Sequence, residues 1–135
     1  MSQEINKQAV KDMQESIAQG DLEGMFDVMT DDVIFRVIGT HRLGQREYLG
    51  KKDITENILA VMFGIFDDNG IKTEIQDISA DGDKVFLQFS GQATTRSGRD
   101  YFNEYVQIMR FREGKICELV EYLDTQALAS ILEES

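Results

Sequence analysis

The chain of 135 residues contains no proline, one cysteine and one histidine, and these shortages exclude several classes of protein. The single Cys117 cannot form a disulfide within the chain, which fits a reducing compartment and a cytoplasmic location. His41 is the only histidine and there is no Cys-x-x-Cys pair, so the common metal-binding motifs are absent. We therefore expect neither a metal nor another cofactor.

Basic residues are also scarce, since 14 Lys and Arg stand against 25 Asp and Glu and give a formal net charge of -11. Binding to a phosphate backbone depends on Lys and Arg that displace counterions, so we expect no nucleic acid partner. An anionic membrane surface is disfavoured for the same reason. The Gly-x-Gly-x-x-Gly and P-loop motifs that hold nucleotide phosphates are absent as well.

Long hydrophobic runs are missing too. The longest apolar stretch, residues 58–66, is far shorter than the roughly 20 residues that cross a bilayer as a helix. The first ten residues lack the basic region and apolar run of a signal peptide. No repeat or linker-like segment divides the chain, so we expect one cytoplasmic domain over residues 1–135.

Helical patterns precede strand patterns along the chain. The apolar spacing of Ile5, Ala9, Met13 and Ile17 predicts a helix over residues 2–19, and further helices are expected over 22–29, 52–66 and 125–132. Strands are expected over residues 33–38, 71–79, 84–95, 101–112 and 115–123, with glycine turns between the last four. This order predicts an α+β fold in which helices close a curved antiparallel sheet into a cone around a pocket.

One face of the last two predicted strands is unusually polar. In "YFNEYVQIMRFREGKICELVEYL", every second residue gives Tyr101, Asn103, Tyr105, Gln107, Met109 and Phe111, and then Cys117, Leu119, Glu121 and Leu123. Burying a polar group without a partner costs about 1 to 3 kcal/mol, so this face does not suit an ordinary core. We interpret it as the wall of a pocket for a small, mostly apolar molecule or for trapped water.

Three segments resemble a known superfamily. "GDLEGMFDVMTDDVIF", "GKKDITENI" and "NEYVQIMRFREGKICELVEYLDT" resemble nuclear transport factor 2-like proteins, in the SnoaL-like polyketide cyclase branch related to ketosteroid isomerases. The resemblance spans residues 5–132 and implies the conical fold. It leaves function open, because the superfamily includes isomerases, cyclases, epoxide hydrolases, dehydratases and non-catalytic binding or dimerisation modules.

The resemblance can be carried over residue by residue. The position of the isomerase base holds Arg36, which stays protonated, and the two oxyanion positions fall near Met13 and at Gln107. The three catalytic positions of limonene epoxide hydrolases correspond to Tyr105, Gln107 and Glu121, so only one carboxylate is retained. The resemblance to SnoaL-like cyclases implies that Glu121 is the acid/base residue.

Glu121 is accordingly the candidate catalytic residue. Leu119 and Leu123 flank it on its strand face, so desolvation should raise its pKa toward neutrality. Alternatively, Glu121 forms an ion pair with Arg36 or lies at a wet rim. A register shift of one residue would replace it on this face with Tyr122.

Five other residues are candidate ligand contacts. Asn103, Tyr105 and Gln107 can donate hydrogen bonds to a carbonyl or enolate oxygen, or can form a network with ordered water. His41 lies in "GTHRLG", a loop expected at the pocket mouth, and is either a ligand or proton-transfer residue or a solvated side chain. Arg36 could bind an acidic ligand if it does not neutralise the carboxylate.

The opposite face of the sheet is apolar. It carries Phe86, Phe102, Val106, Ile108, Val120 and Tyr122. A symmetric homodimer is the simplest way to cover such a face, and the family resemblance implies the same. The sequence thus predicts either an enzyme for isomerisation, cyclisation or dehydration next to a carbonyl, or a non-catalytic ligand-binding or dimerisation module.

Overall fold

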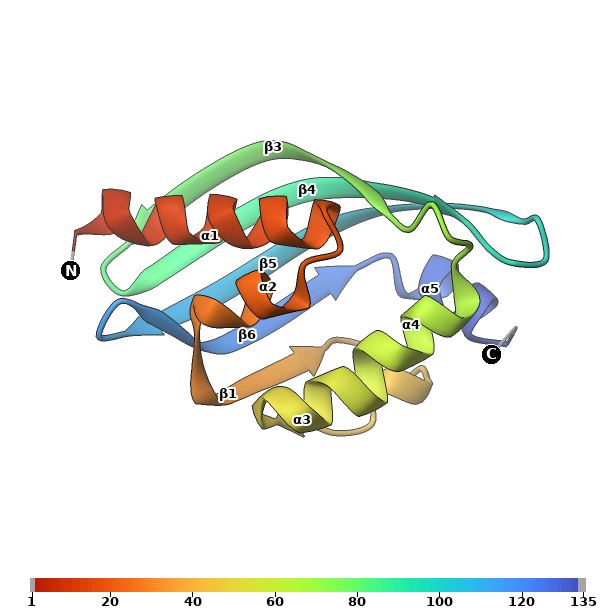
Figure 1. Cartoon of the computed structure of the whole chain (residues 1–135), viewed down its shortest axis with the longest axis horizontal. Helices are drawn as coiled ribbons and strands as arrows, with labels where there is room; N and C mark the ends of the chain where they lie inside the picture. The colour runs from red at the N-terminus through yellow and green to blue at the C-terminus, as the bar shows by residue number, and fades with distance from the viewer. Residues whose placement is uncertain (1, 134–135) are drawn as a thin grey trace.

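The chain folds as α+β, with helices packed on the concave face of a six-stranded sheet (Figure 1). The structure is a computed structural model and describes residues 2–133. Its helices are α1 (Gln3–Ala18), α2 (Leu22–Asp27), α3 (Gly50–Ile54), α4 (Ala60–Ile65) and α5 (Thr125–Leu132). Its strands are β1 (Met29–Val37), β2 (Tyr48–Leu49), β3 (Lys72–Asp81), β4 (Lys84–Thr94), β5 (Asp100–Arg112) and β6 (Lys115–Leu123). The predicted fold class is confirmed.

The strands follow the order β2-β1-β6-β5-β4-β3. The last four strands form the predicted antiparallel meander. The pair β1 and β6 is parallel, which the sequence reading did not anticipate. After β1 and β2 the chain runs through α3 and α4 and enters the meander at its far edge, so β6 returns beside β1 in the same direction (Figure 1).

Helix α1 lies along β3 and β4 (Figure 1) and buries a face rotated from the predicted one. Its buried residues are Asn6, Val10, Met13 and Gln14, whereas Ile5 is 53% exposed. The apolar stripe therefore located the helix correctly and misplaced its buried face. Hydrophobic periodicity does not predict the buried face, because two of its four residues, Asn6 and Gln14, carry amides.

The predicted third helix is a single helical run with a π-helical segment, Thr55–Leu59, between α3 and α4. Ile54, Ile58 and Ile65 are its buried residues, as the apolar spacing predicts. Helix α5 begins one residue after its cap, Asp124, whose Oδ1 accepts hydrogen bonds from the backbone N–H groups of Gln126 and Ala127. None of the helices within residues 2–133 is long and apolar enough to span a bilayer.

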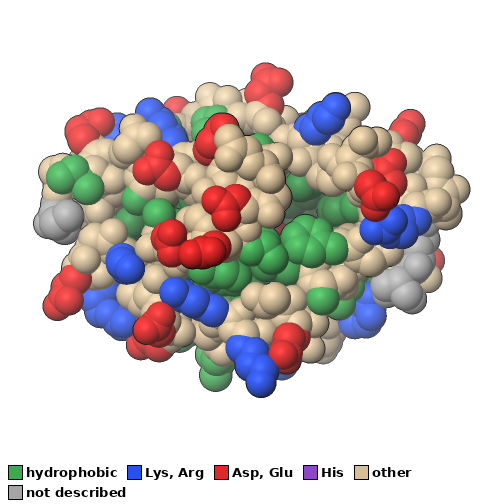
Figure 2. All heavy atoms as spheres, in the orientation of Figure 1, with side chains coloured by type: hydrophobic (Ala, Val, Ile, Leu, Met, Phe, Trp, Pro, Cys, Tyr) green, Lys and Arg blue, Asp and Glu red, His purple; other side chains and the backbone are tan. Residues whose placement is uncertain are grey.

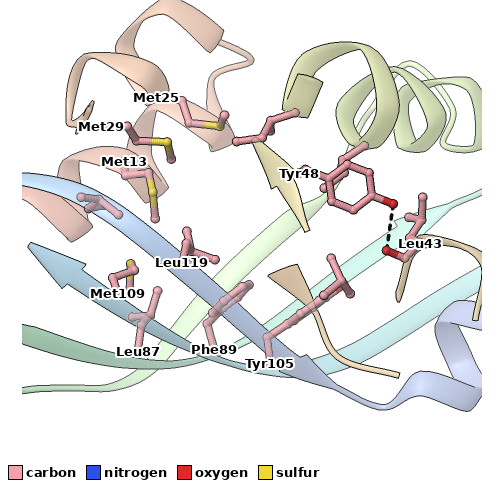
Figure 3. Close-up of a cluster of buried hydrophobic side chains, with 14 of the residues drawn as sticks. Met13, Met25, Met29, Leu43, Tyr48, Leu87, Phe89, Tyr105, Met109 and Leu119 are labelled. Carbon is pink, nitrogen blue, oxygen red and sulfur yellow. Dashed lines mark hydrogen bonds between the residues drawn. The ribbon is translucent and has the colours of Figure 1, made fainter. Parts of the chain in front are cut away.

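The core lies between the helices and the inner face of the sheet (Figure 3). Met13, Met25 and Met29 come from α1, α2 and the start of β1 and are all buried in this core (Figure 3), and unbranched methionine side chains fill irregular spaces well. A bulge in β6 puts Ile116 opposite Phe111 and buries Ile116 in place of Cys117. Beyond the bulge the predicted alternation resumes.

The outer face of the sheet carries the apolar residues that strand alternation predicts. Phe102, Val106 and Tyr122 are 57%, 39% and 44% exposed. Their placement on the convex side is confirmed. The homodimer that would cover them stays a prediction.

Candidate functional site

A cavity of about 570 Å³ lies between the helices and the concave face of the sheet. Its walls are mainly apolar and include Met13, Phe35, Ile58, Met62, Phe89 and Leu119. Figure 2 shows hydrophobic side chains gathered in a hollow between α1 and α2 on one side and α3 and α4 on the other. The size and lining are those of a small-molecule site.

Glu121 lies on the cavity wall, at the register position opposite Gln107. The Gln107 Nε2 donates a hydrogen bond of 2.7 Å to the Glu121 Oε1. Glu121 is partly buried in this wall, and desolvation of its carboxyl by the surrounding protein raises its pKa to about 7, although the hydrogen bond from Gln107 acts in the opposite direction. Within residues 2–133, no basic side chain forms an ion pair with it. Tyr122, the alternative for this position, faces outward.

Arg36 does not reach the cavity. It lies exposed on the outer side of β1, beside Val120 of β6, while its neighbours Phe35 and Val37 line the cavity. Alternation along β1 requires this arrangement, because successive side chains point to opposite faces. The prediction that Arg36 neutralises the catalytic carboxylate or binds a ligand in the pocket is therefore wrong.

Asn103 faces inward as predicted but lies behind the cavity wall. It is 1% exposed, and its Oδ1 accepts a hydrogen bond of 2.9 Å from the Asp124 N–H. Its Nδ2 donates to the Asp124 carbonyl oxygen at 3.0 Å and to the Tyr101 hydroxyl oxygen at 2.8 Å. The expectation that Asn103 contacts the ligand directly is wrong, because every hydrogen of its amide is already used by the protein.

Tyr105 lines the cavity from β5, and its ring stacks on Phe89 with centroids 4.6 Å apart. Its hydroxyl oxygen lies 2.8 Å from that of Tyr101. Burial raises the pKa of Tyr105 far above its usual range, so the hydroxyl keeps its proton at any physiological pH. Tyr105 can therefore donate a hydrogen bond and cannot act as a base.

His41 lies outside the cavity wall, although Leu43 from the same loop lines it. The His41 Nε2 is 2.9 Å from the Ile38 carbonyl oxygen, which can only accept, so Nε2–H donates a hydrogen bond to that oxygen. The imidazole also lies close to Gly39 and Thr125, beside the start of α5. The predicted place of His41 at the pocket mouth is wrong.

Several polar residues that line the cavity are not among the predicted site residues, and Arg96 and Gln14 are two of them. Arg96, in the turn between β4 and β5, donates to the Asp68 carboxylate and to the Phe63 carbonyl oxygen, both at 3.1 Å, and lies at the opening. Gln14 of α1 accepts a hydrogen bond of 3.4 Å from the Thr73 hydroxyl. Gln14 follows Val10 at helical spacing and could have been found from that spacing, whereas the place of Arg96 depends on how a loop folds back.

Residues 2–133 contain no group of three His, Cys, Asp or Glu side chains placed to hold a metal ion. The expectation that the protein needs no metal or other cofactor stays a prediction. The chemistry that the site offers comes from its own side chains. On β5 and β6 these are the carboxyl of Glu121 with its raised pKa, the phenolic donor Tyr105 and the amide of Gln107. Gln14 and Arg96 add an amide and a guanidinium elsewhere in the lining.

A model of the SnoaL-like domain matches residues 10–119. The chain belongs to the SnoaL-like domain family. The match covers most of the helical layer and the cavity, takes in five of the strands completely, and ends inside β6, two residues before Glu121. Among curated proteins, none matches the sequence.

Solved structures agree with this SnoaL-like assignment. An NTF2-like protein of unknown function from Burkholderia pseudomallei is 20% identical over 98% of both chains, with a TM-score of 0.83. TerC, co-crystallised with polyporic acid, is 23% identical over 96% of this chain and 98% of its own, with a TM-score of 0.82. A candidate SnoaL-like polyketide cyclase from Jannaschia is 16% identical over 100% of this chain and 97% of its own, with a TM-score of 0.80. Such low identities establish the fold, which confirms the predicted resemblance, and leave the reaction open.

Proposed function

We propose that this SnoaL-like protein is an enzyme that moves a proton on a small, mostly apolar carbonyl compound. The observation that carries the proposal is a carboxyl without an ion-pair partner in an apolar cavity. Its pKa of about 7 lets Glu121 take up and release a proton at neutral pH. Structural carboxylates in protein interiors usually have a basic partner, and within residues 2–133 this one has none.

The proton transfer uses two groups of the cavity wall. The Glu121 carboxylate removes a proton from the carbon next to the ligand carbonyl. The electron pair of that C–H bond forms a carbon–carbon double bond, and the π pair of the C=O bond moves onto the oxygen. The Tyr105 hydroxyl donates a hydrogen bond to the enolate oxygen that forms. Protonated Glu121 then returns a proton either to the same carbon, which exchanges its hydrogen, or to a conjugated carbon, which isomerises the ligand. In both cases the Glu121 carboxylate is restored.

Exchange of hydrogen for deuterium tests this proposal without knowledge of the natural substrate. The methyl protons of 2-acetylnaphthalene lie next to its carbonyl, and NMR in deuterium oxide follows their replacement. We expect the wild type to accelerate exchange by about a hundredfold or more and Glu121→Gln to abolish the acceleration. Glu118→Gln, on the outer side of the same strand, is the matched control and should exchange like the wild type.

A non-catalytic ligand-binding module is the second candidate. It is favoured by the structural use of Asn103, whose amide hydrogens are taken up by Asp124 and Tyr101 and are therefore not offered to a ligand. TerC, which has the same fold, was co-crystallised with polyporic acid. Binding of 2-acetylnaphthalene by the wild type without any acceleration of exchange would support this candidate over the enzyme.

A further inference from the structure

Two residues behind the cavity wall, Tyr101 and Asn103, are joined to Tyr105 by an unbroken row of hydrogen bonds. We infer that they are positioning residues that fix the Tyr105 hydroxyl as a one-way donor, so that the ligand must present a lone-pair acceptor, such as a ketone oxygen, at this wall. The inference specifies the class of ligand for the proposed function. Binding of such a ligand does not depend on catalysis, and only the proton transfer that would follow rests on the proposed function.

The row begins where the orientation of an amide is certain. The backbone N–H of Asp124 can only donate, so the atom 2.9 Å from it must be the Oδ1 of Asn103. The other amide atom is then Nδ2, which carries two hydrogens. One goes to the Asp124 carbonyl oxygen at 3.0 Å and the other to the Tyr101 hydroxyl oxygen at 2.8 Å. Asn103 is therefore a donor to Tyr101.

The next link has only one sensible direction. Tyr101 is 3% exposed and does not line the cavity, and its hydroxyl has two neighbours, the Asn103 amide and the Tyr105 hydroxyl. Because the amide donates, the single hydrogen of Tyr101 can be accepted only by the Tyr105 oxygen. The opposite direction would leave the Tyr101 hydrogen buried without an acceptor, which is unfavourable. Tyr101 is therefore a donor to Tyr105.

The last hydrogen of the row remains available. No acceptor among residues 2–133 receives the hydroxyl hydrogen of Tyr105, and Tyr105 lines the cavity. The donated bond from Tyr101 polarises the hydroxyl and strengthens it as a donor. The charge of Glu121 acts on both tyrosines, so the donor and the acid/base carboxyl share one chamber.

The ring of Tyr105 is also held in place from its other side. It stacks on Phe89, and a Cβ at Gly91 would lie 2.9 Å from its Cε1. The ring therefore has little freedom to turn its hydroxyl elsewhere. A ligand that binds here meets one fixed hydrogen-bond donor, and a ligand without an acceptor leaves that donor unsatisfied.

A matched pair of probes tests the inference. 2-Acetylnaphthalene and 2-isopropenylnaphthalene have nearly the same shape, and only the ketone has an acceptor oxygen. The dissociation constants of both probes are measured for the wild type, Tyr105→Phe, Tyr101→Phe and the control Tyr122→Phe on the outer face. The infrared carbonyl band of the bound ketone, labelled with ¹³C, reports the hydrogen bond directly.

The expected results separate a relay from simple packing. Relative to the wild type, the ketone-to-alkene ratio of dissociation constants should rise by about tenfold in Tyr105→Phe and about threefold in Tyr101→Phe, and stay constant in Tyr122→Phe. The carbonyl band should lie at lower frequency in the wild type than in hexane, return to the hexane position in Tyr105→Phe and move part of the way in Tyr101→Phe. A Tyr101 that only fills space would weaken both probes equally and leave the band unchanged.

A sharper variant turns the row around. Asn103→Asp replaces the donating Nδ2 with an acceptor oxygen, so Tyr101 should donate to the new carboxylate and Tyr105 to Tyr101. The ketone should then lose its donor although both tyrosines remain. The inference is overturned if the wild type binds neither probe, if its carbonyl band lies at the hexane position, or if Tyr101→Phe matches the wild type in both readouts. These measurements report binding, so their failure is distinct from a failure of Glu121 to exchange protons.

Discussion

At the scale of single residues, Glu121 couples the stability of the fold to pH. Its pKa rises from 4.5 in a free side chain to about 7 in the folded protein. Between these values the unfolded chain has released the proton that the folded protein still holds, so the free energy of unfolding falls as pH rises. The contribution is fully present below about 4.5 and is lost by a pH somewhat above 7.

The first prediction rests on this linkage. Glu121→Gln removes the titration. The difference between its unfolding free energy and that of the wild type should therefore rise by about 3 kcal/mol in favour of the variant between about pH 4.5 and pH 8. Urea unfolding at several pH values measures the difference. Glu118→Gln is the control, because its side chain lies on the outer side of β6, and it should keep the wild-type pH dependence. Parallel curves for wild type and Glu121→Gln would mean that the carboxyl titrates normally.

A second prediction concerns Gly91, which the chain needs for space. A Cβ here would lie 2.7 Å from the Ile71 Cδ1 and 2.9 Å from the Tyr105 Cε1. The isoleucine end can shift, but the stacked tyrosine ring cannot, so Gly91→Ala should destabilise the protein by about 1 to 3 kcal/mol. Gly64 on α4 has open space around its position, and Gly64→Ala should instead stabilise by about 0.5 to 1 kcal/mol. Thermal unfolding of both variants tests the contrast.

At the scale of elements, two residues stabilise the start of α5 by different means, and only one of them, Asn103, belongs to the sheet. Asp124 caps the helix with its side chain, whereas Asn103 of β5 binds the backbone N–H and carbonyl of Asp124. The cap is exposed to solvent, so Asp124→Ala should cost about 1 kcal/mol. Asn103→Ala leaves buried groups without partners and should cost about 3 kcal/mol. Equal losses in urea unfolding would refute the view that Asn103 is the stronger attachment.

The elements also explain how much of the structure the sequence predicts. Alternation along β4, β5 and β6 has a period of two, so it placed Glu121, Tyr105 and Gln107 on the inner face and the apolar residues on the outer one. The same rule, applied to β1, puts Arg36 on the outer face. The prediction placed it inward because Arg36 was matched to the position of the catalytic base in related isomerases.

Features that depend on tertiary contacts could not be predicted in this way. Whether Asn103 faces a ligand or a helix start depends on where α5 docks, and no periodicity encodes that. The position of His41 behind the wall and that of Arg96 at the opening depend on how two loops fold back. The buried face of α1 was missed because Asn6 and Gln14 occupy it.

At the scale of the whole molecule, the convex side of the sheet carries a continuous apolar surface. Val106 lies opposite Tyr122 on β6, and Ile108 lies opposite both Val120 and Phe86. Exposed apolar patches of this kind on a protein of net charge -11 are unfavourable in water unless they are covered. A second copy of the chain, related by a twofold axis, would cover the patch with itself.

The final prediction is that the protein is a homodimer through this surface. Sedimentation velocity at micromolar concentration should give a particle of twice the 15.4 kDa chain mass. Val106→Asp puts a charge at the centre of the patch and should yield monomers with an intact fold, because burying two unpaired carboxylates in a shared interface is costly. Ile5→Asp, which charges an exposed apolar residue on α1 away from the sheet surface, should leave the dimer unchanged. A wild-type monomer would show that the apolar surface does not mediate self-association. A dimer that persists in Val106→Asp would place the interface on another face.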